Sequence, residues 1–348
     1  MTTTNENLFT QPFRVEELWF TDGNIVLTAG NAQYKVYRGI LAKQSTVFAD
    51  MLSLPLPPDG DEQVDGCPAV TLHDAEVEVT PFLKALFDAS FFQAFPTETD
   101  FTTIYGCLRL AHKYDVDFLR QRALVHFSSV YPMTLKGYQD GTSFASLGDR
   151  MLSSVCSWEI PEDDEAVLCA LQLAREVGAT WTLPIIFYEL GESFFRLGHK
   201  IFSGVVYEGV RAQIGQDDAT TLIHGLHAQI AQGAVVMRFL CHSDEVSDCP
   251  SPLACLRRRL YTAETMRALN ENYLSQPLVL WAPDDWDQME DQCAACLAEL
   301  KLQHATALEA FWEELPSMYD LPPWKDLEEM KRAAIGQHQS DSENEQDS

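Results

Sequence analysis

Apolar and polar residues alternate on both sides of a short turn near the start of the chain. Ile25 and Leu27 precede Gly30-Asn31, and Tyr34 and Val36 follow it. Side chains of a β-strand point alternately to the two faces of a sheet. This spacing on both sides of a Gly-Asn turn therefore predicts a β-hairpin.

Helical spacing follows the hairpin. Phe48, Met51 and Leu52 lie on one helical face, and Ser45 precedes them at the position expected for an N-cap. Residues 69–72 are a candidate strand. Further helices are expected where apolar residues recur every three or four positions, namely after Pro81, from about Thr102 and around Phe118. A small sheet with several packed helices predicts an α+β fold for this part of the chain.

The pattern after Pro132 predicts helices and no strand. Apolar residues recur at helical spacing in 166–177, 222–230 and 288–312. We therefore expect an α+β domain followed by a mostly α-helical domain. The predicted boundaries are a disordered leader at 1–15, the α+β domain at 16–130, the helical domain at 131–335 and a disordered acidic tail at 336–348.

Three segments of the first domain carry a more specific pattern. The first segment, 22–27, begins with Asp22 and continues as a strand. The second segment, 34–52, and the third, 108–119, consist mainly of apolar residues with polar residues at a few positions between them. In this order and spacing they resemble a BTB/POZ domain, in which a small sheet packs against helices. The resemblance marks five family-pattern positions, which we expect mainly to hold the fold: Asp22, Arg38, Ser45, Phe48 and Tyr114.

The chain also departs from that family pattern. Tyr37 stands where the family usually has His, the loop at 54–66 is long and rich in proline, and 87–90 replaces the usual Tyr-Thr-Gly. The chain as a whole resembles the BTB-domain proteins abundant in mushroom-forming fungi. Its helical part is similar in position to the helical BACK regions of other BTB proteins.

The resemblance implies an adaptor or scaffold that binds other proteins, as a homodimer in many members. Some members carry substrates to a cullin ubiquitin ligase, although the hydrophobic-x-Glu element common in those members is not evident at 54–56. Two alternatives stay open. One is a transcription- or chromatin-associated regulator, which usually adds zinc fingers or a basic region. The other is an enzyme with an unrecognised site in the helical domain.

The charge of the chain limits its partners. There are 52 acidic and 24 basic residues, and the formal net charge is −28. Binding to nucleic acid requires Lys and Arg at the phosphates, so we expect no direct nucleic-acid partner. We also expect no membrane segment, because no apolar stretch approaches the length of a bilayer-spanning helix. No signal peptide is visible, so we expect an intracellular protein, cytoplasmic or nuclear or both.

Common catalytic motifs are absent from the sequence. It contains no phosphate-binding Gly-rich loop, no Gly-x-Ser-x-Gly and no His-Glu-x-x-His. His73-Asp74 matches two members of a catalytic triad, but a surface-loop pair is the simpler interpretation because no nucleophile is marked. We therefore expect no enzymatic activity.

Two cysteine pairs form a candidate metal site. Cys249 and Cys255 are separated by five residues, and Cys293 and Cys296 by two. Four thiolates in two such pairs suit structural zinc, with Cys241 or His242 as substitute ligands. The alternative is that these cysteines are small buried apolar residues. The total of nine cysteines is odd and argues against a secreted disulfide scaffold.

One basic triplet, 257–259, interrupts the acidic composition. Three residues are a weak signal for nuclear import. A helix surface that faces acidic residues is the interpretation we prefer.

Overall fold

The computed structural model describes residues 11–54, 63–145, 156–161, 163–241, 246, 248–269 and 274–335. The chain divides into two compact units. The first comprises Met1–Val130 with Leu152–Ile160 and Val206–Arg211, and the second comprises Tyr131–Met151, Pro161–Val205 and Ala212–Ser348. From the sequence we expected 156–160 and Val206–Arg211 in the helical domain, whereas both belong to the first unit.

A five-stranded sheet opens the first unit, with strand order β1-β3-β2-β5-β4. The strands are β1 (Phe13–Trp19), β2 (Ile25–Ala29), β3 (Ala32–Val36), β4 (Gln63–Val64) and β5 (Cys67–Leu72). The predicted hairpin is confirmed, because β2 and β3 pair antiparallel with Ile25 opposite Val36. Gly30 turns the chain between them with a φ of 55°, which glycine adopts at little cost.

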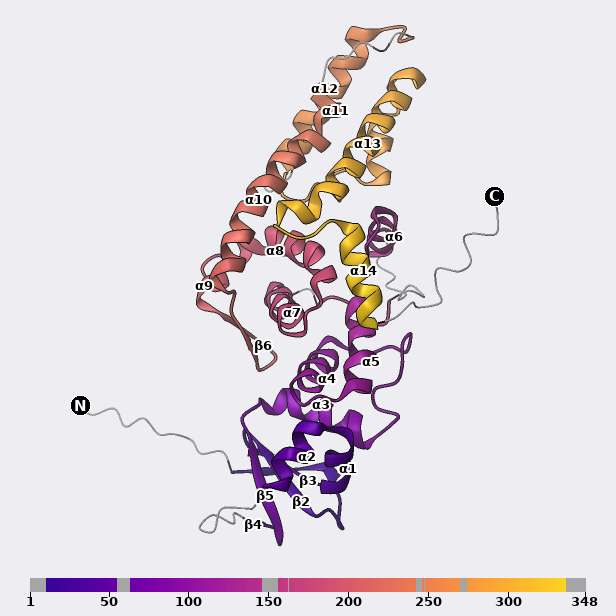
Figure 1. Cartoon of the computed structure of the whole chain (residues 1–348). Coiled ribbons are helices and arrows are strands. Elements are labelled where there is room, and N and C mark those ends of the chain that lie inside the picture. Colours follow the sequence, from indigo (N-terminus) through magenta and orange to yellow (C-terminus); the bar gives the residue numbers. More distant parts are fainter. Residues whose placement is uncertain are drawn as a thin grey trace, which may run out of the picture. The chain divides into compact units, whose positions relative to one another are not determined.

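Helices cover this sheet in Figure 1. They are α1 (Arg38–Gln44), α2 (Thr46–Ser53), α3 (Glu76–Phe87), α4 (Phe101–Lys113) and α5 (Asp117–Ser128). Leu41, Phe48 and Leu108 are fully buried, whereas Leu86 is half-buried. The fold of this unit is α+β, as predicted.

The expected disordered leader at 1–15 is wrong for its last residues. Strand β1 begins at Phe13, whose N–H donates to the carbonyl of Asn31 at 2.8 Å, and it runs parallel to β3. It lies at the edge of the sheet and only Leu18 is buried, so the strand lacks the alternation by which a half-buried strand is recognised. Residues 1–10 lie outside the described part of the chain.

A buried histidine joins α5 to the segment 156–160. The Nε2 of His126 donates to the carbonyl of Gln93 at 2.9 Å, and its Nδ1 accepts from the Ser157 hydroxyl at 2.7 Å. The indole of Trp158 donates to the His126 carbonyl at 2.6 Å. Both ring nitrogens of the neutral His126 imidazole are thus hydrogen-bonded, one as donor and one as acceptor.

We expect the first unit to lose stability in mild acid because of His126. Burial lowers the pKa of its imidazole below the ordinary value. Below about pH 6.5 the unfolded chain binds a proton that the native state rejects, so the free energy of unfolding decreases as pH falls. Titration of the His126 ring signals by NMR measures this pKa. A pKa at or above about 6.5, the ordinary value for histidine, contradicts the expectation.

The second unit is mainly helical. Its helices are α6 (Leu135–Ala145), α7 (Asp164–Val177), η1 (Thr180–Thr182), α8 (Leu183–Leu197), α9 (Lys200–Ser203), α10 (Gln216–Val236), α11 (Arg238–Cys241), α12 (Pro252–Leu269), η2 (Pro283–Met289), α13 (Ala294–Met318) and α14 (Trp324–Ile335). Within the described residues, none of these helices has both the length and the apolar character needed to cross a membrane.

The expectation of no strand after Pro132 is wrong. Strands β6 (Val205–Tyr207) and β7 (Val210–Ala212) form a two-stranded sheet. Glu208 and Gly209 between them have φ values of 47° and 86°, as in the tight turns that match the twist of a hairpin. Three residues on each side are too few to show a clear alternation in the sequence.

Close packing of α10 defines the interior of the second unit. A Cβ added at Gly225 would lie 2.1 Å from the ring of Tyr319, so only glycine fits there. The Tyr319 hydroxyl donates to the amide oxygen of Gln229, and its ring stacks on Phe187 with centroids 5.0 Å apart. The C-terminal part of α13 is thereby packed against α8 and α10.

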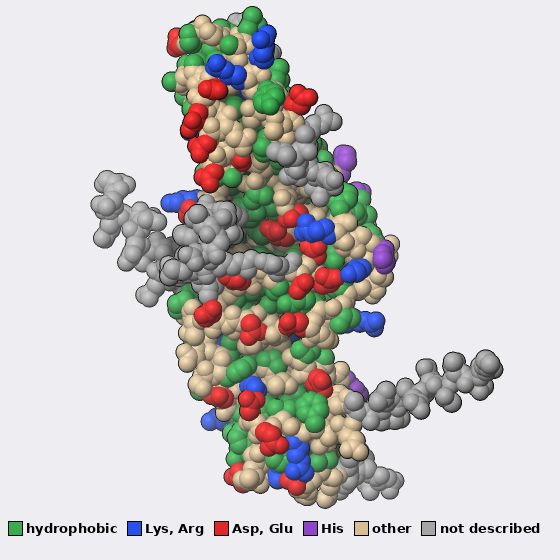
Figure 2. Space-filling model, turned by 180° about the vertical axis from the view of Figure 1, so that it is seen from behind, with side chains coloured by type: hydrophobic (Ala, Val, Ile, Leu, Met, Phe, Trp, Pro, Cys, Tyr) green, Lys and Arg blue, Asp and Glu red, His purple; other side chains and the backbone are tan. Residues whose placement is uncertain are grey.

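Acidic side chains are spread along the face seen in Figure 2, and basic ones are fewer. Many basic side chains are already in ion pairs with acidic ones, such as Arg175 with Asp218 and Arg196 with Asp164. This face therefore agrees with the net charge of −28.

Candidate metal centre and interaction groove

The four candidate cysteines meet in the second unit. Cys249 lies just before α12 and Cys255 in its first turn, whereas Cys293 is the N-cap of α13 and Cys296 lies in the first turn of that helix. The structure thus brings together two pairs that are 37 residues apart in sequence. Cys241 is exposed and is not part of this cluster, and His242 lies outside the described residues.

The sulfur separations match a tetrahedral thiolate site. All four Sγ atoms lie within 4.8 Å of one another; Cys249 is 3.7 Å from Cys255 and 3.6 Å from Cys293. A Zn–S bond of about 2.3 Å in a regular tetrahedron requires sulfurs about 3.8 Å apart. A disulfide requires about 2.05 Å, and all four cysteines are free thiols. The donor set and its spacing therefore fit zinc.

The surroundings of the sulfurs favour a closed site. Cys255 and Cys296 are buried, and Cys249 and Cys293 are half-buried. The backbone N–H of Cys296 donates to the Cys293 sulfur and lowers the pKa of that thiol to about 7, as expected at a helix N-terminus. Burial raises the pKa of Cys296. Four protein sulfurs leave no open position for a substrate, so the geometry suits a structural ion rather than a catalytic one.

Other contacts hold the same two segments together. The side-chain amide of Gln292 donates to the carbonyl of Cys255 at 3.1 Å, and Arg258 donates to the carbonyl of Asp291. These contacts between protein groups hold the start of α12 against the start of α13 without the help of an ion. The cysteine pairs thus approach as parts of a preformed arrangement.

The five family-pattern positions make contacts inside the first unit. Ser45 caps α2 by accepting from the N–H of Phe48 at 2.9 Å, and its hydroxyl donates to the carbonyl of Tyr114. The rings of Phe48 and Tyr114 stack with centroids 4.5 Å apart. Arg38 donates from its guanidinium to the carbonyl of Leu52, and Asp22 accepts from the Tyr37 hydroxyl at 2.6 Å.

The His73-Asp74 pair has a structural explanation. Asp74 accepts from the Tyr114 hydroxyl and from Lys113, both near the end of α4, while His73 is exposed. Burial and the Asp74 carboxylate raise the pKa of Tyr114. Asp74 therefore holds the end of α4, and among the described residues its hydrogen-bond partners are Tyr114 and Lys113 rather than a serine or cysteine.

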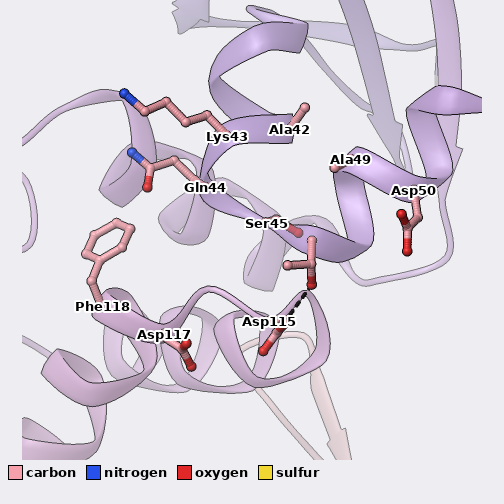
Figure 3. Close-up of a pocket in the computed structure, with 10 residues that line it drawn as sticks. Ala42, Lys43, Gln44, Ser45, Ala49, Asp50, Asp115, Asp117 and Phe118 are labelled. Carbon is pink, nitrogen blue, oxygen red and sulfur yellow. Dashed lines mark hydrogen bonds between the residues drawn. The ribbon is translucent and has the colours of Figure 1, made fainter.

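An open groove lies beside these structural residues. It has a volume of about 520 Å³ and is lined by 42–46, Ala49 and Asp50 on one side and by Asp115, Asp117 and Phe118 on the other. Figure 3 shows Lys43 and Gln44 on α1 near Phe118 at the start of α5. The Thr46 hydroxyl donates to the Asp115 carboxylate at 2.6 Å and joins the two walls; the dashed line in Figure 3 marks this bond. No single sequence motif marked this groove, because its walls are about 70 residues apart.

Comparison of this chain with family models, with curated proteins and with solved structures finds no match.

Proposed function

We propose that the protein is a protein-interaction adaptor whose first unit acts as a BTB/POZ-like domain. The observation that carries the proposal is the groove between α1–α2 and the start of α5. Phe118 gives the groove an apolar side chain that is 41% exposed. The groove is also lined by three carboxylates, those of Asp50, Asp115 and Asp117, and by one lysine, Lys43. A partner segment with an apolar side chain flanked by basic residues complements this surface.

We expect Phe118→Glu to remove the partner, because it puts a fourth carboxylate in place of the apolar contact. Affinity purification with quantitative mass spectrometry compares this variant with the wild-type chain. Val206→Glu is the matched control, because Val206 is 62% exposed and lies outside the groove. Proteins lost with Phe118→Glu and retained with the control are groove partners. An unchanged set of co-purifying proteins contradicts the proposal.

A cullin is the partner class that the family resemblance suggests for the groove. Purified cullin added to the purified chain tests this directly, and no binding by the wild-type protein rules it out. A second copy of the chain is the other occupant of interest. Light scattering on the same samples identifies it, since Phe118→Glu then converts a dimer into a monomer.

The proposal also includes structural zinc in the second unit. The ion would be held by Cys249, Cys255, Cys293 and Cys296, and it would lock α12 to α13 without taking part in a reaction. None of the nine cysteines, all of which lie in the described part of the chain, forms a disulfide, which suits a reducing intracellular compartment.

A further inference from the structure

Helix α12 in the second unit has two opposite faces of different character. Cys255, Arg259, Thr262 and Ala263 are buried. Five exposed residues lie on the other side, within an arc of about 100° given 3.6 residues per turn; they are Leu253, Arg257, Leu260, Tyr261 and Glu264. We call these five residues the α12 face.

The α12 face is unusually apolar for an exposed helix surface. Leu253 is 81% exposed, Tyr261 71% and Leu260 44%. Single exposed apolar residues are ordinary, but three large ones aligned on one helix face indicate a contact surface. Exposed helix surfaces normally carry charged side chains at such positions.

The two charges of the face are arranged symmetrically. Arg257 lies three residues before Leu260, and Glu264 lies three residues after Tyr261. Among the residues that the structure describes, neither Arg257 nor Glu264 has an ion-pair partner. The charges of Arg257 and Glu264 therefore cancel, and the two side chains lie at equal distances along the helix from the central pair Leu260 and Tyr261.

This arrangement is complementary to itself. When two copies of α12 pack antiparallel about a twofold axis through the Leu260–Tyr261 step, Leu260 meets the partner's Tyr261. Arg257 then meets the partner's Glu264, and the same ion pair forms a second time. We propose that two copies of this chain associate through the α12 face. A strongly acidic or strongly basic partner would leave one of the two charges unpaired, so a second copy complements the face best.

The helix is well fixed for such a contact. Arg258 on its flank donates to the Asp291 carbonyl, and Thr262 and Ala263 are buried against the rest of the unit. Figure 1 shows α12 and α13 extending together within the second unit. The α12 face is therefore presented by a helix whose other side is buried, so little backbone order has to be gained on association.

The association is expected to be weak. One helix pair buries less than the roughly 1,200 Å² of a standard interface, so we expect a dissociation constant on the order of 10 µM. The two ion pairs are near the surface, so added salt weakens the association further. A contact of this strength forms at high protein concentration, or when a second contact elsewhere in the chain already holds two copies together.

Charge reversal tests the pairing in the full-length protein by sedimentation equilibrium. R257E gives a face with two acidic side chains and E264R a face with two basic ones, so each variant repels its own copies. We expect each to dissociate at least about tenfold more readily than the wild-type chain. An equimolar mixture of R257E and E264R, and the double variant R257E/E264R, both regain wild-type association.

Two controls separate this result from a folding defect and from the groove. R211E makes the same charge change at an exposed residue of β7, which is not part of the α12 face, and leaves association unchanged. Circular dichroism checks that every variant is folded. F118E tests the groove and leaves the α12 contact intact. The inference is overturned if the wild-type chain stays monomeric at about 100 µM, which is about tenfold above the expected dissociation constant. Failure of the mixture to associate also overturns it.

Discussion

Replacing Cys293 and Cys296 by serine is expected to abolish zinc binding by the purified protein. The wild-type chain is expected to carry about one equivalent of zinc, since four sulfurs at tetrahedral spacing make one closed site. Folding free energy in such sites includes the metal-binding energy, so the double variant loses several kcal/mol of stability in the second unit. Elemental analysis measures the metal, and urea denaturation followed by circular dichroism measures the stability.

The matched control for this experiment is Cys67→Ser with Cys241→Ser. It removes the same number of thiols, but neither cysteine belongs to the cluster. Its zinc content and midpoint of unfolding are expected to stay close to the wild-type values. Cobalt added to the metal-free protein gives an independent result, because a tetrahedral tetrathiolate site produces strong visible absorption. Wild-type protein that folds fully without metal and takes up no cobalt disproves the zinc site.

The Glu78→Ala substitution is expected to cost about 2 kcal/mol of stability in the first unit. The Glu78 side chain is 3% exposed, and both of its oxygens accept from Arg109, at 2.7 and 2.9 Å. The substitution removes both charge-assisted hydrogen bonds from a buried site, while the Arg109 side chain that remains is 32% exposed and is partly solvated. Denaturation by urea, with the wild-type chain in parallel, gives the difference in the free energy of unfolding.

Asp117→Ala is the control for the Glu78 variant. Asp117 also pairs with an arginine, Arg120, but its side chain is 83% exposed, so its loss is expected to cost less than about 1 kcal/mol. Equal effects of the two substitutions contradict the argument from burial. The close approach of the helices explains why the pair forms: a Cβ at Gly106 would lie 2.8 Å from the Glu78 carbonyl, so glycine lets α4 come close to α3.

Local patterns predicted much of the first unit. The β2–β3 hairpin follows from alternation around Gly30, and the cap of α2 follows from Ser45 at the start of a helical apolar pattern. Both features depend on residues a few positions apart. Strand β1 was missed for the opposite reason, since an exposed edge strand is specified by hydrogen bonds to β3 rather than by its own side chains.

The candidate sites show the same division. The sequence supplied the four cysteines and their pairing by spacing, but it could not distinguish buried apolar thiols from ligands. The groove was not predictable at all, because Lys43 and Phe118 become neighbours only when α1 and α5 pack. The α12 face was also not predicted. We interpreted the basic triplet at 257–259 as part of a single helix surface, whereas Arg259 is buried and Arg257 is exposed.

The sequence alone therefore determined the α+β class, the hairpin, the helical second unit and the residues available for metal binding. These properties depend on periodicity and residue type, which are local. Tertiary structure decided that two cysteine pairs 37 residues apart in sequence converge, that two walls of a groove meet, and that Leu253 and Tyr261 stay exposed. Those outcomes depend on which helix faces are buried against one another, and the free energy of that burial is shared by residues far apart in the chain.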